Sequence, residues 1–403
     1  MATETHVFDG ATPFTIFGSM YNWFNGNNYG GIVSVNEFGA PPHALDVTFS
    51  DGPWRIETLL FYTPNGMDVT ITDSADGFDR DIEYLRLSDG NHAVSLTTTE
   101  VKFIRHSADT GQIDLQTGVN TVRAIDLSGG NDRVTTGVGR IEYLDTGQGD
   151  DTVTLADNGR IIALRMHDGA DVFHGSTGAD SRVDFFVSYG GGDNVVNVGR
   201  TTFESLNLHA DAGETATVNG GSGDLRVVRL VGAGTFNFDS GTGRVENLRG
   251  IDGNHNLTIG DSGSDAIVLG SGVNSVMYGG TGYSGNFTSY SGNNTLTIGA
   301  NAQVRTIGTS NGVDELTVHG RFDAASLGAG NDVVTLTGSG RGNTLDLGDG
   351  DNRLQATSDE YLNALVAYNG DDTVMINNAQ FNMNTLYVGG GGQPAASFSR
   401  ARQ

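Results

Sequence analysis

Aspartates recur along this chain at a regular spacing, and side chains that repeat in this way can supply ligands for a metal. Aligning the stretches around Asp132, Asp151 and Asp332 places an Asp, Asn or His at one position about every 20 residues. We call this position the Asx column. It contains Asp132, Asp151, Asp171, Asn194, His255, Asn274, Asn294, Asp314, Asp332, Asn352 and Asp372. Calcium takes about six to eight oxygen ligands, so carboxylates from successive repeats predict calcium sites.

The candidate metal ligands are the aspartates of this column and aspartates next to it in the sequence. The column supplies Asp132, Asp151, Asp171, Asp314, Asp332 and Asp372, and the neighbouring positions supply Asp150, Asp193, Asp351 and Asp371. About half of the column is Asn or His, so we expect calcium along only part of it. The alternative is a ladder of Asx side chains that stabilises a solenoid without any metal.

Arginines form a second column, about eleven residues before the Asx positions and therefore half a repeat away. This arginine column contains Arg140, Arg160, Arg182, Arg244, Arg321 and Arg341. One interpretation is a stripe that binds the carboxylate or sulfate groups of an acidic polysaccharide, because guanidinium groups match such anions. The other is local pairing with Glu142, Asp184 and Glu246, each two residues on. Exposed pairs of this kind contribute only about 0–1 kcal/mol each.

The elements that position both columns follow from the residues around the Asx column. A glycine stands two residues before each position, and an apolar residue stands two residues after it. The Gly-x-Asx pattern favours a turn. Alternation of apolar and polar residues, as in Val334-Thr335-Leu336, is typical of a β-strand. A strand and a turn repeated every ~20 residues are one coil of a β-solenoid, which buries its apolar face only by stacking. We therefore predict an all-β, right-handed parallel β-solenoid, with two further coils in the irregular stretch 200–250.

Three regions are predicted along the chain. Residues 1–115 hold five of the six prolines and both tryptophans, which favours a β-rich cap over the end of the solenoid. The alternative for this region is a binding module that uses Tyr21, Trp23, Phe24 and Tyr29 as a stacking platform. Residues 116–392 form the solenoid, and residues 393–403 are a tail outside the repeat.

The Gly-x-Asx-x-apolar repeat resembles the calcium-binding repeat of RTX (haemolysin-type) proteins, Gly-Gly-x-Gly-x-Asp-x-apolar-x, in a degenerate form. Gly328-Ala-Gly-Asn-Asp-Val-Val334 is one of the stretches that carry the resemblance. The resemblance implies a β-roll with calcium between successive turns, held by Asp carboxylates and backbone carbonyls. It also implies a secreted or cell-surface bacterial protein, exported by a type I route. One difference is that the family carries two such turns per coil, whereas this chain carries one.

Composition excludes several classes of function. The chain has no cysteine, so neither a disulfide framework nor a cysteine-ligated zinc site is available. A net charge of −26 argues against nucleic-acid binding, which requires a basic surface. The apolar runs are far shorter than the ~20 residues that span a bilayer, so no membrane span is predicted.

The leading prediction is a calcium-binding structural or adhesive module that is not an enzyme. Its expected partner is a cell-surface polysaccharide or another acidic glycan, and open solenoid ends favour end-to-end self-association. Two alternatives remain open. One is a polysaccharide lyase or epimerase, which requires a carboxylate, an arginine and a histidine or tyrosine to converge in one groove. The other is a lectin-like protein that binds acidic glycans without converting them.

Overall fold

The computed structural model consists of strands and contains no helix in the residues that it describes. These are residues 3–8, 15–16, 19–20, 32–36, 44–49, 54–62, 68–73, 80–107, 110–378, 381–388 and 397–400. Among them, no helix is available to cross a membrane. Parallel strands stack into about 16 turns of about 20 residues each, which confirms the predicted β-solenoid. The chain divides into two compact units, Met1–Glu204 and Ser205–Gln403, which are described separately.

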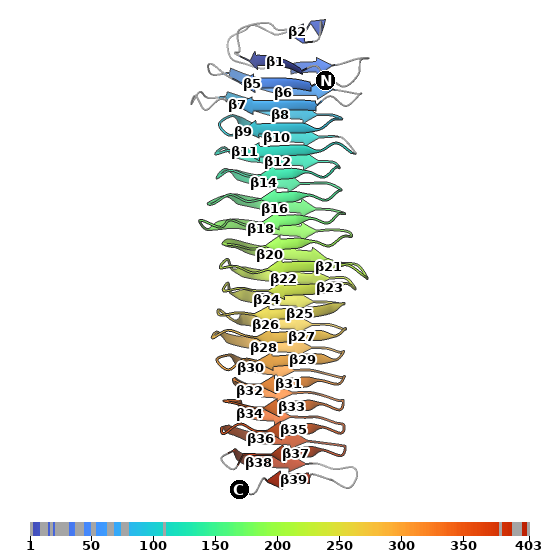
Figure 1. Cartoon of the computed structure of the whole chain (residues 1–403), viewed down its shortest axis with the longest axis vertical. Coiled ribbons are helices and arrows are strands. Elements are labelled where there is room, and N and C mark those ends of the chain that lie inside the picture. The colour runs from blue at the N-terminus through green and yellow to red at the C-terminus, as the bar shows by residue number, and fades with distance from the viewer. Residues whose placement is uncertain are drawn as a thin grey trace. The chain divides into compact units, whose positions relative to one another are not determined.

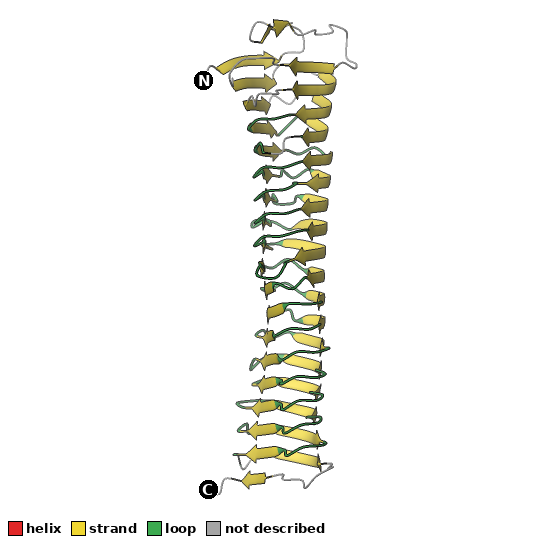
Figure 2. Ribbon diagram, turned by 90° about the vertical axis from the view of Figure 1, so that its right-hand side faces the viewer, coloured by secondary structure: helices red, strands yellow, loops and turns green. Residues whose placement is uncertain are grey.

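Unit 1 contains two parallel sheets, which lie on opposite sides of the stack and are joined by loops (Figures 1 and 2). We call them the Asx sheet and the Arg sheet, after the columns that precede or begin their strands. The Asx sheet contains β1 (Thr3–Phe8), β5 (Ala44–Phe49), β7 (Asp68–Asp73), β9 (His92–Leu96), β11 (Ile113–Thr117), β13 (Arg133–Thr135), β15 (Thr152–Thr154), β17 (Val172–His174) and β19 (Val195–Asn197). The Arg sheet contains β4 (Ile32–Asn36), β6 (Trp54–Tyr62), β8 (Arg80–Leu87), β10 (Glu100–His106), β12 (Val122–Leu127), β14 (Arg140–Asp145), β16 (Arg160–Met166) and β18 (Ser181–Ser188). A short antiparallel pair, β2 (Thr15–Ile16) and β3 (Ser19–Met20), lies outside both sheets.

Unit 2 repeats the same two-sheet arrangement, and its boundary with unit 1 falls within β20 (Thr201–His209). Its Asx sheet contains β21 (Thr215–Asn219), β23 (Thr235–Asp239), β25 (Asn254–Ile259), β27 (Asn274–Tyr278), β29 (Asn294–Ile298), β31 (Glu315–Val318), β33 (Val333–Leu336), β35 (Arg353–Ala356), β37 (Thr373–Ile376) and β39 (Ser397–Arg400). Its Arg sheet contains β22 (Leu225–Val231), β24 (Val245–Gly250), β26 (Ser264–Leu269), β28 (Tyr283–Ser289), β30 (Gln303–Gly308), β32 (Arg321–Ser326), β34 (Arg341–Asp346), β36 (Tyr361–Ala367) and β38 (Asn382–Val388). The strands β21 and β23 occupy the stretch where two coils were expected.

The core of each unit lies between its two sheets, because alternate side chains of every strand point inward. In unit 1, Val134, Val153 and Phe173 are paired in register on successive strands of the Asx sheet and are fully buried. The Phe173 ring meets Phe186 and Phe203 edge to face, with centroids 5.7 and 5.4 Å away. Burying each such side chain contributes about 1.5–3 kcal/mol, so the stack is stabilised turn by turn.

The described part of residues 1–115 contains the same parallel pairing as the rest of unit 1. Strand β7 pairs with β9, β9 with β11, and β11 with β13, all in parallel. The solenoid thus extends toward the N-terminus beyond residue 116, where the sequence placed its start. The proposed stacking residues Tyr21, Trp23, Phe24 and Tyr29 lie outside the described residues. Of the predicted tail 393–403, residues 397–400 form β39, which pairs in parallel with β37.

Candidate functional site

Many of the corners before strands of the Asx sheet bring successive backbones close together and therefore need glycine. Gly149 has φ of +124°, a conformation that side chains disfavour, and a Cβ at this position would lie 2.1 Å from Gly130 O. Gly350 repeats this arrangement in unit 2, with a Cβ 1.9 Å from Gly330 O. After each such corner the chain enters the strand with the Asx side chain on the core side.

In unit 1, the backbone N–H groups before and along the Asx column each donate to the Asx side chain one turn later. Ile113 N–H donates to Asp132 Oδ1 at 2.7 Å, and Asp132 N–H donates to Asp151 Oδ1 at 2.8 Å. Asp151 N–H donates to Asp171 Oδ1, and Asp171 N–H to Asn194 Oδ1, both at 3.0 Å. We call this chain of bonds the inner ladder. Its side chains are at most 2% exposed.

Unit 2 contains the same inner ladder, in which Asp and Asn take the same role. Asn294 N–H donates to Asp314 Oδ1 and Asp314 N–H to Asp332 Oδ1, both at 2.8 Å. Asp332 N–H donates to Asn352 Oδ1 at 2.9 Å, and Asn352 N–H to Asp372 Oδ1 at 3.1 Å. The position thus requires a hydrogen-bond acceptor, which an amide supplies as well as a carboxyl group.

A second set of bonds, the outer ladder, runs in the opposite direction on the exposed side of the corners. Asn131 Oδ1 accepts the Asp150 N–H at 2.9 Å, and Asp150 Oδ1 accepts the Ala170 N–H at 2.8 Å. In unit 2, Asp351 Oδ1 accepts the Asp371 N–H at 2.8 Å. The side chains of Asp150, Asp193, Asp351 and Asp371 are exposed. The neighbouring aspartates therefore lie on the other side of the backbone from the column.

Burial in the inner ladder favours the protonated form of its carboxyl groups. Burial raises the pKa of Asp151 from 3.8 to about 8, and it raises the pKa of Asp132, Asp171 and Asp332 to about 7. The pKa of Asp372 is also raised by burial. The second oxygen, Oδ2, of all five side chains is buried without a hydrogen-bond partner. Desolvation therefore outweighs the hydrogen bonds that stabilise the charged form.

The inner ladder brings at most one carboxyl group per turn to the column. Among the described residues, no group of three or more acidic or histidine side chains is placed to hold a metal ion. Each turn contributes one buried carboxyl group to the column, and its Oδ1 already accepts a backbone N–H. The unpartnered Oδ2 atoms are single oxygens, whereas calcium requires about six to eight. The observed geometry therefore fits the metal-free ladder, and calcium binding remains a prediction.

The arginine column consists mainly of local ion pairs. Arg140, Arg160 and Arg182 are in register on three successive strands, and Arg321 pairs in register with Arg341. Every member has a carboxylate partner: Arg140 with Glu142, Arg160 with Asp184, Arg182 with Asp184 and Glu204, Arg244 with Asp265, Arg321 with Asp323, and Arg341 with Glu360. Glu246, expected beside Arg244, instead pairs with Arg226 at 3.8 Å.

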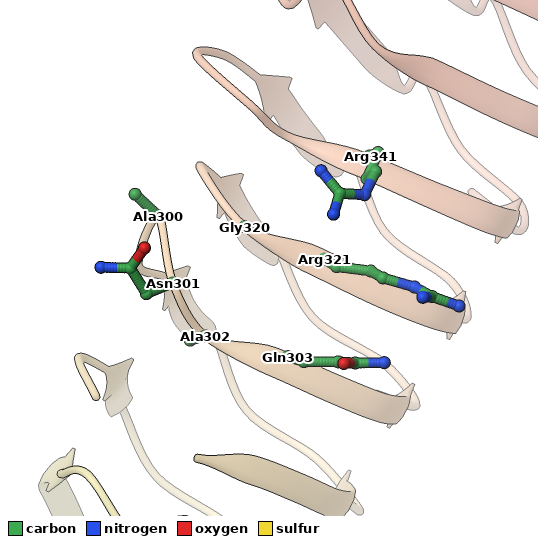
Figure 3. A pocket seen from close by; sticks show the side chains of 7 residues that line it. All are labelled: Ala300, Asn301, Ala302, Gln303, Gly320, Arg321 and Arg341. Carbon is green, nitrogen blue, oxygen red and sulfur yellow. The ribbon is translucent and has the colours of Figure 1, made fainter. Parts of the chain in front are cut away.

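Two of the six arginines line a hollow of about 280 Å³ in unit 2, shown in Figure 3. Gln303, Arg321 and Arg341 project from three successive strands of the Arg sheet (Figure 3). Ala300, Asn301, Ala302 and Gly320 complete the lining, and their small size makes the space. The buried Arg321 Nε has no hydrogen-bond partner. The hollow is of a size to hold one anionic group and part of a sugar ring.

Unit 1 contains a polar cluster that the sequence analysis missed, and we call it the Tyr143 cluster. Tyr143 and Asp145 belong to β14, Arg165 belongs to β16, and His167 follows β16 directly. Tyr143 Oη donates to Asp145 Oδ2 at 2.6 Å, and Arg165 Nη1 donates to Tyr143 Oη at 3.2 Å. His167 Nε2 lies 2.9 Å from Asp145 Oδ1. The signal in the sequence was the two pairs Tyr-x-Asp and Arg-x-His, one turn apart.

Comparison with known proteins adds no functional assignment. No protein-family model matches the chain, and a search of curated proteins finds no similar sequence. The function is therefore argued from the geometry of the columns, the hollow and the cluster.

Proposed function

We propose that this protein is a structural and adhesive module of a bacterial cell surface or extracellular medium. The observation that supports the structural role is the inner ladder, which links successive turns through buried side chains over residues 113–194 and 294–372. A ladder of this kind fixes the spacing of the outer side chains at about 4.8 Å per turn. It thereby presents surface groups as regular columns, which suits repeated contact with a polymer.

The ligand class that we propose is an acidic polysaccharide, and the hollow around Arg321 and Arg341 supports this choice. A carboxylate or sulfate that enters the hollow meets two guanidinium groups and the Gln303 amide. Hydrogen bonds to charged groups contribute about 1.5–3 kcal/mol each, twice the neutral value. All six arginines of the column have carboxylate partners, and Arg321 and Arg341 are the two that line this hollow. We therefore restrict the glycan site to unit 2.

Binding of the purified chain to immobilised glycans tests this proposal. Polygalacturonate supplies carboxylates, dextran sulfate supplies sulfates, and neutral dextran supplies neither group. We expect retention on at least one acidic glycan, release by salt, and a loss of about tenfold or more in affinity for Arg321→Gln combined with Arg341→Gln. Arg353→Gln is the matched control, because Arg353 is an exposed arginine on the opposite sheet of the same unit.

Either of two results would contradict the adhesive role. One is equal retention on the acidic and neutral glycans. The other is an equal loss of affinity for the control and the double variant, which would mean that overall charge rather than the hollow determines retention. The structural role does not depend on this result, because the ladder is tested separately by its own substitutions.

A further inference from the structure

The Tyr143 cluster brings together the groups that proton transfer at a carbon next to a carboxylate requires. Such a reaction needs a base, a cation that neutralises the substrate carboxylate, and an acid for the leaving group. Tyr143, Asp145, Arg165 and His167 supply these types within hydrogen-bond reach of one another on the Arg sheet of unit 1.

Asp145 is the positioning residue of the cluster. Its carboxylate accepts hydrogen bonds from Tyr143 Oη and from the Gly147 N–H at 3.2 Å, and its Oδ1 lies 2.9 Å from His167 Nε2. The Asp145 side chain is 16% exposed and the His167 side chain is 38% exposed. A carboxylate this close to Nε2 favours the tautomer that carries its proton on Nε2, so that Nδ1 carries the lone pair of a base. The imidazole is therefore oriented and remains accessible.

Arg165 and Tyr143 form the cationic and acidic side of the cluster. The Arg165 guanidinium lies over the Tyr143 ring, 5.3 Å from its centroid, and its Nε has no hydrogen-bond partner among the described residues. Burial, together with the neighbouring Asp145 carboxylate, raises the pKa of the Tyr143 phenol, so this group keeps its proton at neutral pH. It is therefore available as a proton donor.

The surface beside the cluster has a composition that suits a sugar ring. Tyr143, Ala163 and Phe185 occupy one column on three successive strands, so a small side chain separates two aromatic ones. Phe185 and Tyr189 are 37% and 45% exposed, and the Tyr189 ring lies 5.7 Å from the His167 ring. Exposed aromatic side chains of this kind present apolar faces to a pyranose.

We propose that the Tyr143 cluster is a catalytic site that removes the C5 proton of a uronate residue in an acidic polysaccharide. Arg165 binds the C6 carboxylate, and His167 Nδ1 takes the C5 proton. The C–H electron pair forms the C4=C5 double bond, the C4–O glycosidic bond breaks, and the leaving oxygen takes the proton of Tyr143. The Tyr143 phenolate regains a proton from the His167 imidazolium through water. No oxidant, reductant or metal takes part in this step.

Exchange of the C5 hydrogen in heavy water tests this activity directly. Oligogalacturonate and oligomannuronate are incubated with the full chain in D₂O, and NMR follows deuterium at C5 while ultraviolet absorbance follows the double bond. We expect deuterium or double bonds with at least one substrate. His167→Gln should lower the rate about 10²–10⁴-fold. Asp145→Asn should lower it and shift the pH profile, because the tautomer of His167 is no longer fixed.

The matched control is His174→Gln, which removes an exposed histidine that bonds to Asn197 on the Asx sheet of the same unit. Its rate should equal that of the unchanged protein, and circular dichroism checks that every variant folds. Absence of both deuterium and double bonds with the unchanged protein would overturn the proposal. So would an equal loss of rate in His167→Gln and His174→Gln. Glycan binding at the hollow in unit 2 is independent of either result.

Discussion

At the scale of single residues, the inner ladder selects for a hydrogen-bond acceptor and not for charge. Asp and Asn accept a backbone N–H in the column, and His92 Nδ1 likewise accepts the Val69 N–H at 3.3 Å. Asn side chains add a donor, since Asn274 Nδ2 donates to Asn294 Oδ1 at 2.9 Å. An Asp in the same place leaves Oδ2 without a partner. The aspartates are thus the less satisfied members of the ladder.

Substitution of Asp151 separates the role of the acceptor from that of the charge. Asp151→Ala leaves the buried Asp132 N–H without an acceptor, and we expect a loss of about 1–3 kcal/mol in the free energy of unfolding. Asp151→Asn keeps the acceptor and should cost little or stabilise the protein at neutral pH. Urea denaturation measures both. Asp150→Ala is the control, because water replaces its exposed bond to the Ala170 N–H; an equal loss there would contradict the ladder.

The spacing of these residues could be predicted from the sequence. The sequence also indicates that their side chains face the core, although this was not predicted. Asp132 stands two residues before Val134, and residues two apart in a strand share a face. The apolar position is buried, so the aspartate had to face the core as well. Calcium ligands were inferred from residue type and stay a prediction, whereas the burial of these carboxyl groups is observed.

At the scale of elements, each turn depends on a corner that only glycine fits. Gly350 has φ of +124° and its Cβ would meet Gly330 O, whereas Gly338 has φ of +60° and open space around it. We expect Gly350→Ala to destabilise the protein by about 1–3 kcal/mol more than Gly338→Ala, because it adds a backbone clash to the strain. Thermal unfolding of the two variants measures this difference. Equal losses would show that strain alone matters.

The repeat allowed the strands to be predicted, but not where the stack begins or which polar groups meet. Glycine, Asx and apolar residues kept their phase from residue 118 onward, so the coils there were visible. Before that point, His92 is the inner-ladder member and few corners carry Gly-x-Asx, although the same parallel pairing continues. The Tyr143 cluster was missed because Tyr143 and Arg165 are far apart in sequence and meet only across neighbouring strands.

At the scale of the whole molecule, the raised pKa values of the inner ladder make stability depend on pH. The folded chain keeps protons on Asp132, Asp151, Asp171 and Asp332 up to about pH 7 or 8, while the unfolded chain releases them near 3.8. Stability from these groups is therefore fully present below about pH 4 and is lost as the pH rises to about 8. We expect a higher melting temperature at about pH 5 than at about pH 8.

Replacing the ladder carboxyl groups distinguishes this effect from repulsion among the surface charges. The triple variant Asp132→Asn, Asp151→Asn and Asp171→Asn keeps the exposed acidic side chains, which supply most of the net charge of −26. Its melting temperature should fall less between pH 5 and pH 8 than that of the unchanged protein. An unchanged slope would assign the pH dependence to the surface.

Calcium provides the second test on the whole molecule. The inner ladder holds the turns through hydrogen bonds from backbone N–H groups to side-chain oxygens, which need no metal, so we expect the circular dichroism spectrum and the melting temperature to stay the same in EGTA and in millimolar calcium. A ligand that binds only the folded state raises the melting temperature by mass action. A rise with calcium would therefore contradict this expectation and support the RTX-type interpretation of the Asp column.

The opposite directions of the inner and outer ladders have a consequence for how such a chain can change its length. Within each ladder, a turn accepts a hydrogen bond from one neighbouring turn and donates one to the other. Its two faces therefore carry complementary donors and acceptors. A gene duplication that copies one ~20-residue turn inserts a piece whose two faces already fit. Recombination can thus lengthen or shorten the protein by whole turns, while an insertion that moves an Asx side chain out of its corner breaks both ladders at that turn.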